Sequence, residues 1–176
     1  LDAGAALRTL MRYTYLHVRG AVATLAVDGD SVTLGYEIYQ SHVEATDQIG
    51  DAAVAVIFNI MRELCGPAWK PVQIRFAHRK PKDVGPFQQF FRAPLVFDAT
   101  GNAIVFSADW LNRRLPAIDP DLRRLLQKQI DALENRHGED FPGQVRSVLR
   151  TALVAGHGGV GQVADVFLIH CRTLCR

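Results

Sequence analysis

Residues 21–40, with the sequence AVATLAVDGDSVTLGYEIYQ, decide the fold class of this chain. Apolar and polar residues alternate on both sides of Asp28-Gly29-Asp30, and such alternation is typical of a strand that buries one face. An Asp-Gly pair between two such runs favours a tight β-hairpin, because glycine readily adopts the positive φ that these turns require. The segment therefore predicts antiparallel strands at residues 21–27 and 32–40. One face of the second strand carries Val32, Leu34, Tyr36 and Ile38.

Helices and shorter strands are expected around this hairpin. Residues 5–19 have apolar side chains at helical spacing, and residues 47–65 are apolar nearly all round in their centre, which predicts a helix buried against the sheet. Shorter elements follow: strands at 72–77, 95–98 and 103–106, and helices at 86–91 and 108–112. The last two strands are expected to form a second hairpin through Thr100-Gly101-Asn102. The sequence thus predicts an α+β domain with a mixed or mostly antiparallel sheet of about five strands packed with helices.

The C-terminal part is predicted to be helical. Asp119-Pro120 is typical of an N-cap followed by proline, and the helix that it opens carries a leucine-rich stripe up to about Gly138. The composition changes at residues 138–142, so we expect residues 1–138 to form the main domain and residues 139–176 to begin a small helical one. Because the chain lacks an initial Met and stops within a helical pattern, we expect a fragment at both ends.

Composition limits the classes of protein. A chain of 176 residues with 48% hydrophobic residues can bury a core without disulfides, and a net charge of +2 is too small to indicate nucleic acid by itself. Three cysteines suit a reducing compartment. No signal peptide is visible, and the most apolar stretch, residues 52–58, is too short to cross a membrane. We therefore expect a cytoplasmic protein that does not bind membranes.

Two motifs suggest a cofactor or metal site, but the residues around them do not support one. Residues 156–161, GHGGVG, satisfy G-x-G-x-x-G, but a dinucleotide site needs a strand before the glycines and a carboxylate about 20 residues later. The preceding run has helical spacing, so we interpret this motif as an interhelical loop. The metal-ligand types His157, His170, Cys171 and Cys175 lack a C-x-x-C pair. No recognisable catalytic neighbourhood surrounds any serine, cysteine or carboxylate, so we expect neither a cofactor nor an enzyme.

Residues 162–176, QVADVFLIHCRTLCR, predict a short helix, a tight turn and the start of a second helix. Ala164 is small where the two helices would cross, and Arg172, Thr173 and Arg176 would project from the second helix toward a DNA major groove. The segment resembles the first helix-turn-helix of AraC/XylS-type transcription regulators, with Arg172-Thr173-Leu174 and Arg176 as the strongest match. It departs from that pattern at Leu168, Cys171 and Cys175.

The resemblance extends upstream. The chain is similar to the arabinose-binding-type N-terminal domain of AraC-type regulators related to ornithine and arginine utilisation regulators, at residues 74–78, 81, 87–91, 94–97, 102–106 and 115–120. This resemblance implies a homodimeric regulator controlled by a small-molecule effector, an amino acid or a related metabolite. It implies that Arg172, Thr173 and Arg176 contact DNA in the full-length parent. The first helix-turn-helix is incomplete, so we expect this chain alone to bind DNA weakly or not at all.

For the effector, the sequence offers aromatic and polar candidates. Tyr36, Phe76, Phe87 and Phe97 could line an apolar pocket between sheet and helices, with His78 or Arg75 as a polar anchor. Each has an alternative role in the core or in a turn. The leucine stripe of residues 119–137 could pack on the sheet or on a second copy of the chain. A protein-interaction or scaffold domain without a ligand is the alternative function.

Overall fold

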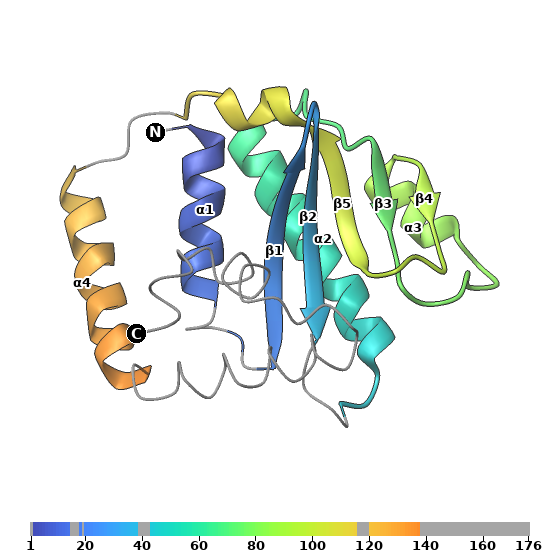
Figure 1. Ribbon diagram of the computed structural model, residues 1–176, viewed down its shortest axis with the longest axis horizontal. Helices are drawn as coiled ribbons and strands as arrows, with labels where there is room; N and C mark the ends of the chain where they lie inside the picture. Colours follow the sequence, from blue (N-terminus) through green and yellow to red (C-terminus); the bar gives the residue numbers. More distant parts are fainter. Residues whose placement is uncertain (1, 15–17, 19, 39–42, 116–119, 138–176) are drawn as a thin grey trace.

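The computed structural model describes residues 2–14, 18, 20–38, 43–115 and 120–137. Within these residues, five strands form one mixed sheet in the order β1-β2-β5-β3-β4 (Figure 1). The strands are β1 (Ala21–Asp28), β2 (Ser31–Ile38), β3 (Gln73–Arg75), β4 (Leu95–Val96) and β5 (Asn102–Ser107). The helices are α1 (Ala3–Tyr13), α2 (Thr46–Cys65), α3 (Gly85–Phe91), the 3-10 helix η2 (Ala108–Asn112) and α4 (Pro120–His137). The predicted α+β class with a five-stranded mixed sheet is confirmed.

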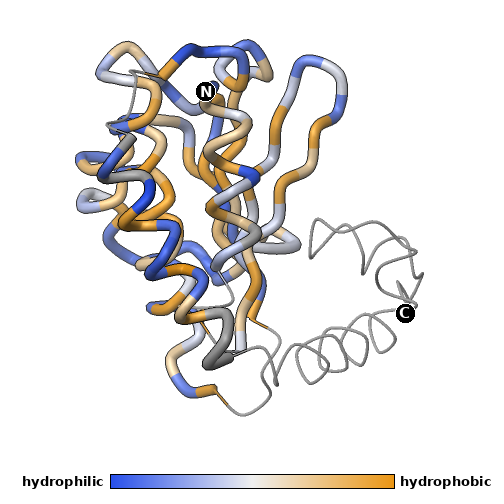
Figure 2. The backbone as a smooth tube through the Cα atoms, turned by 90° about the vertical axis from the view of Figure 1, so that its left-hand side faces the viewer, coloured by the Kyte–Doolittle hydropathy of each residue, from blue (hydrophilic) through white to orange (hydrophobic). Residues whose placement is uncertain are grey.

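The first hairpin forms as its turn chemistry predicts. β1 and β2 pair antiparallel from Ala21↔Ile38 to Asp28↔Ser31, and Gly29 at the turn has a φ of +55°. Hydrophilic residues form the tip of this hairpin, where the chain projects from the molecule (Figure 2). The alternating pattern places Val32 and Leu34 in the core, both fully buried. This hairpin is therefore encoded locally, by the turn residues and the alternation together.

The predicted second hairpin is wrong. β5 pairs antiparallel with β2 on one side and with β3 on the other, and β4 pairs with β3 in parallel through Ile74↔Leu95. β3 therefore lies between β4 and β5, and residues 97–101 carry the chain across its end. Asn102 supports this crossing, because its Oδ1 accepts a hydrogen bond of 3.0 Å from the amide of Ala77, just beyond β3.

Helix α2 lies against β2 and β5 and crosses behind them in Figure 1. Its buried residues are Gly50, Val54, Ile57, Phe58, Met61 and Cys65. The helix is buried against the sheet as predicted, but on one side only, since Val56 in its central apolar run remains 57% exposed. Only one side of α2 faces the sheet, so burial follows helical periodicity even in an apolar run.

The N-terminal helix closes the same side of the core. The Asp2 carboxylate caps α1 by accepting a 2.7 Å hydrogen bond from the Ala5 amide, and Leu7 is fully buried in the core. α1 also contacts η2. Helix α4 lies beyond α1, at the edge of the molecule opposite α3 (Figure 1).

Several predicted features lie outside the described residues. They are the N-cap at Asp119, the domain boundary near Gly138, the glycine-rich loop at 156–161, and the helix-turn-helix with Arg172, Thr173 and Arg176. Among the described helices, none is long and apolar enough to span a membrane.

Candidate functional site

Four of the six predicted effector contacts meet in one aromatic cluster, formed by Phe76, His78, Phe87 and Phe97. Phe76 follows β3 and is fully buried. Its ring stacks on Phe97 at a centroid distance of 5.3 Å and meets the edge of Phe87 at 5.2 Å. The His78 ring lies 5.5 Å from both Phe76 and Phe97. Such stacked and edge-to-face pairs are favourable for aromatic rings, so the cluster forms a packed unit between β3, α3 and α2.

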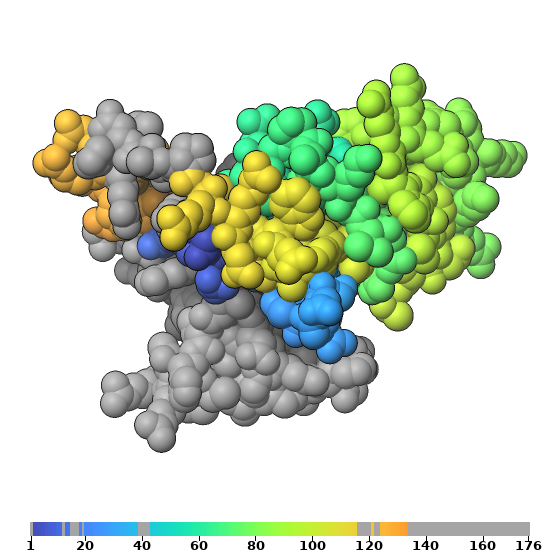
Figure 3. Space-filling view, turned by 90° about the horizontal axis from the view of Figure 1, so that it is seen from above, coloured from blue at the N-terminus to red at the C-terminus, as the bar shows by residue number. Residues whose placement is uncertain are grey.

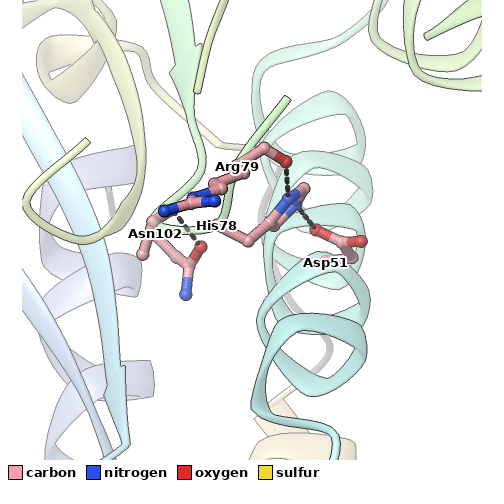
Figure 4. A network of polar contacts seen from close by, with 5 residues as sticks. Asp51, His78, Arg79 and Asn102 are labelled. Atoms are coloured by element: carbon pink, nitrogen blue, oxygen red, sulfur yellow. Dashed lines mark hydrogen bonds and ion pairs between the residues drawn. The ribbon is translucent and has the colours of Figure 1, made fainter. Parts of the chain in front are cut away.

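His78 joins this cluster to helix α2 through polar contacts (Figure 4). Its Nε2 lies 2.9 Å from Oδ1 of Asp51, and its Nδ1 lies 2.8 Å from the carbonyl oxygen of Arg79. The His78 side chain is only 10% exposed, whereas Asp51 is 30% exposed. Both partners accept hydrogen bonds, so the doubly protonated imidazolium, which donates from both nitrogens, satisfies them best.

The pKa of His78 reflects this arrangement. Burial by itself lowers the pKa of the imidazole, but the hydrogen bonds to the Arg79 carbonyl and to Asp51, together with the negative charges of Asp51 and Asp47, outweigh it. The pKa of His78 is therefore raised above its ordinary value. The site thus favours the protonated imidazole of His78 among aromatic rings, with a partly exposed carboxylate beside it.

The other two predicted effector contacts, Tyr36 and Arg75, lie on opposite faces of the sheet. Tyr36 pairs with Asn102 in the sheet register and packs against the core on the helix-covered face. Arg75 alternates with the buried Ile74 and Phe76, so it lies on the opposite face of the sheet. There its guanidinium donates to the Gln73 amide oxygen at 2.6 and 2.7 Å. The structure thus places Tyr36 on the same face as the cluster and separates Arg75 from it.

The sequence interpretation missed Asp51. A signal was available, because this carboxylate stands next to Ala52 and Ala53 in a helix predicted to be buried, where a charge needs a partner. Gly50 beside it allows a close approach: a Cβ there would lie 2.5 Å from Nδ2 of Asn102. Asn102 and Gly50 together therefore fix the distance between α2 and the end of β5.

A pocket of about 660 Å³ opens beside the cluster, between α2, α3 and residues 67–71. Its lining includes Phe58, Trp69, Phe90 and Phe91, and the sequence interpretation named none of them. Phe91 connects the two regions, since its ring lies 5.2 Å from Phe58 and 5.7 Å from Phe76. Within the described residues, no group of three His, Cys, Asp or Glu side chains could hold a metal ion.

Comparison with known families gives the class of this domain. Residues 2–115 match the family described as the arabinose-binding domain of AraC transcription regulator, N-term. The chain therefore belongs to this family, as the N-terminal effector-binding domain of an AraC-type transcription regulator. This is not a family of enzymes, in agreement with the prediction from sequence.

A solved structure shares the fold. The chain is similar to the crystal structure of transcriptional regulator CdpR from Pseudomonas aeruginosa, with a TM-score of 0.59 and 15% sequence identity. The similarity covers 98% of this chain and 57% of that chain. This chain thus corresponds to little more than half of the regulator that it resembles. No curated protein matched the chain in the sequence search.

Proposed function

We propose that this chain carries the effector-binding and dimerising functions of a bacterial AraC-type regulator, in which a small molecule controls DNA binding by the full-length protein. The family match over residues 2–115 carries this proposal, because those residues include the sheet, helices α1 to α3 and the aromatic cluster. The proposed effector contacts are those predicted from the sequence: Tyr36, Arg75, Phe76, His78, Phe87 and Phe97.

The chemistry around His78 suits an amino acid or a related metabolite as the effector. The partly exposed Asp51 carboxylate can accept hydrogen bonds from a ligand ammonium group. The raised pKa of His78 favours a positive charge beside it, which can balance a ligand carboxylate, and the surrounding phenylalanines offer apolar contact. A compact molecule that carries both charges next to an apolar side chain matches these groups.

A thermal-shift screen tests this function. The chain is mixed with amino acids, sugars and small organic acids, and an effector is expected to raise the melting temperature through preferential binding to the folded state. Tyr36→Ala and His78→Ala are expected to abolish this shift while the chain remains folded by circular dichroism. Val56→Ala, on the exposed side of α2, is the control and should respond as the parent does. An unchanged response in the Tyr36 and His78 variants contradicts these contacts, and no response to any compound favours a scaffold domain.

Helix α4 is the proposed dimer interface. Leu125 and Leu126 are 55% and 47% exposed, so these two members of the predicted leucine stripe do not pack on the sheet. A second copy of the chain can bury both across a symmetric contact. Light scattering should show a dimer for the parent chain and a monomer for Leu125→Lys/Leu126→Lys. Gln127→Lys, on the other side of the helix, should stay dimeric; a monomeric parent chain would refute this interface.

DNA binding is proposed for the full-length regulator alone. Arg172, Thr173 and Arg176 are its proposed contacts within the first helix-turn-helix. Because AraC-type DNA recognition resembles two such units joined by a helix, the chain ending at Arg176 is expected to bind DNA weakly or not at all. A gel-shift assay with tight, sequence-specific binding by this chain would contradict the proposal.

A further inference from the structure

The pocket between α2, α3 and residues 67–71 has a lining that combines aromatic rings with positive charge. Its members are Phe58, Arg62, Pro67, Trp69, Lys70, Pro71, Pro86, Gln89, Phe90, Phe91 and Arg92. None of the six effector contacts predicted from the sequence belongs to it. Seen from above, α2 and the α3 region adjoin at the surface on the side of the molecule away from α4 (Figure 3).

Three cations and no carboxylate line this pocket. Arg62 comes from α2, Lys70 from the segment after it, and Arg92 from the end of α3. In the part of the chain that the structure describes, none of the three makes an ion pair. Arg62 instead lies over the Phe58 ring, with its Cζ 5.8 Å from the centroid. The pocket therefore concentrates positive charge in a chain whose net charge is only +2, and such a concavity attracts anions.

Aromatic rings and prolines make up much of the pocket wall. Phe58 is the centre of a ring cluster, with Trp69 at 5.4 Å, Phe90 at 5.5 Å and Phe91 at 5.2 Å. The exposed Phe90 forms an edge of the opening. Pro67, Pro71 and Pro86 restrict the backbone around it. A volume of about 660 Å³ lies in the range of roughly 300–1,000 Å³ that is typical of small-molecule sites.

Trp69 contributes its ring to these walls. The residue is 3% exposed, and its indole N–H has no acceptor among the described residues. That nitrogen has almost no accessible surface, so Trp69 meets the pocket with its ring rather than with its N–H. The pocket thus has exposed cations at its rim and a ring cluster at its base, and the two together favour a ligand that carries acceptor oxygens on an apolar body.

We propose that this pocket binds an organic carboxylate with a large apolar body. The carboxylate is held by Arg62, Arg92 and Lys70, and the apolar body packs on Phe58, Trp69 and Phe91. Guanidinium groups recognise carboxylates with particular strength, because two parallel N–H donors match the two oxygens. Phe91 contacts Phe58 in the pocket and Phe76 in the cluster around His78. A bound ligand therefore touches Phe91, a ring that packs on the cluster around His78, although the ligand site itself does not depend on the proposed effector function.

Tryptophan fluorescence gives a direct test, because the chain has only two tryptophans, Trp69 and Trp110. Replacing Trp110, which lies in η2 outside the pocket, by phenylalanine makes Trp69 the sole reporter. Titration with 4-phenylbutanoate should then change the Trp69 emission in a saturable way. The neutral 4-phenylbutanamide should bind at least about tenfold more weakly, since it loses charge-assisted hydrogen bonds. Raising the salt concentration should weaken the acid more than the amide.

Variants of the rim identify the site. Arg62→Gln and Arg92→Gln are each expected to lower the affinity for 4-phenylbutanoate by about tenfold, and to leave the amide nearly unchanged. Both side chains are exposed, so the fold should tolerate their replacement. Arg8→Gln is the matched control, because it removes an equal charge from an exposed position on α1, outside the pocket. Its affinity for the acid should equal that of the parent.

Two results would overturn this inference. One is equal affinity for the acid and the amide. The other is binding of the acid that Arg62→Gln and Arg92→Gln do not weaken. The broader effector function is separable from it. Either of these results, together with a metabolite-induced thermal shift that survives both rim variants and disappears in His78→Ala, would keep the effector function and reject the carboxylate pocket.

Discussion

The contact between His78 and Asp51 should make the stability of this domain depend on pH, and Asp51→Asn is the perturbation that reveals it. Asparagine keeps the size and an acceptor oxygen but removes the negative charge. A hydrogen bond to a charged group contributes about 1.5–3 kcal/mol to stability. Since Asp51 is 30% exposed, solvent screening reduces this to about 1 kcal/mol. For a chain of this size, such a loss lowers the melting temperature by roughly 2–4 °C.

The direction of the pH dependence follows from the raised pKa of His78. The folded protein holds the proton more tightly than the unfolded chain, so the contribution is fully present below the unfolded pKa of about 6.5. It is lost as the pH rises through the folded pKa. Asp51→Asn should therefore lower the melting temperature by about 3 °C near pH 5.5 and by less than about 1 °C near pH 9.

Calorimetry or circular dichroism across this pH range provides the assay. Glu63→Gln, an exposed carboxylate on the same helix, controls for the change in net charge and should show no such difference between the two pH values. The double variant Asp51→Asn/His78→Gln completes a cycle that isolates the pair. A loss for Asp51→Asn that is equal at both pH values, or larger at the higher one, would show that the imidazolium does not stabilise this contact.

Two further predictions concern the packing around the cluster. Gly50→Ala should lower the free energy of unfolding, measured with urea, by about 1–3 kcal/mol, because the new Cβ would lie 2.5 Å from Nδ2 of Asn102. A Cβ at Gly101 would meet nothing within 4 Å, so Gly101→Ala should change this free energy by less than about 0.5 kcal/mol. Phe76→Ala should cost about 3–5 kcal/mol, because the ring is fully buried among three other rings. Equal unfolding midpoints for Gly50→Ala and Gly101→Ala would contradict the close approach of α2 to Asn102, and a loss below about 1 kcal/mol for Phe76→Ala would contradict its place in the core.

Much of the local structure could be predicted from the sequence. The hairpin followed from Asp28-Gly29 and from the alternation around it, and helix α2 followed from the apolar residues of its centre. The aromatic cluster was anticipated in part, because Phe76, His78, Phe87 and Phe97 were named together, although only as separate candidates for one pocket. Their direct ring contacts became visible only in the structure.

The remaining features depend on contacts between segments that are distant in sequence. Thr100-Gly101-Asn102 has good turn chemistry, and it still does not form a hairpin, because β3 takes the place between β4 and β5. His78 and Asp51 are 27 residues apart, and neither residue alone indicates the other. The pocket was missed for the same reason, since Phe58 and Arg62 lie on α2 whereas Phe91 and Arg92 lie at the end of α3.

The sequence by itself determined the class of this protein: an α+β domain whose first two strands form a hairpin encoded by its turn, and a resemblance to AraC-type regulators that the family match bears out. Short-range chemistry is sufficient for the hairpin and the helices, because backbone turns and side-chain periodicity act within a few residues. Only the tertiary structure decided the order of the strands, the one-sided burial of α2, the partner of His78 and the position of the cationic pocket. Each of these features depends on which segments, distant in sequence, pack against one another, and this is decided by the close packing of the whole domain.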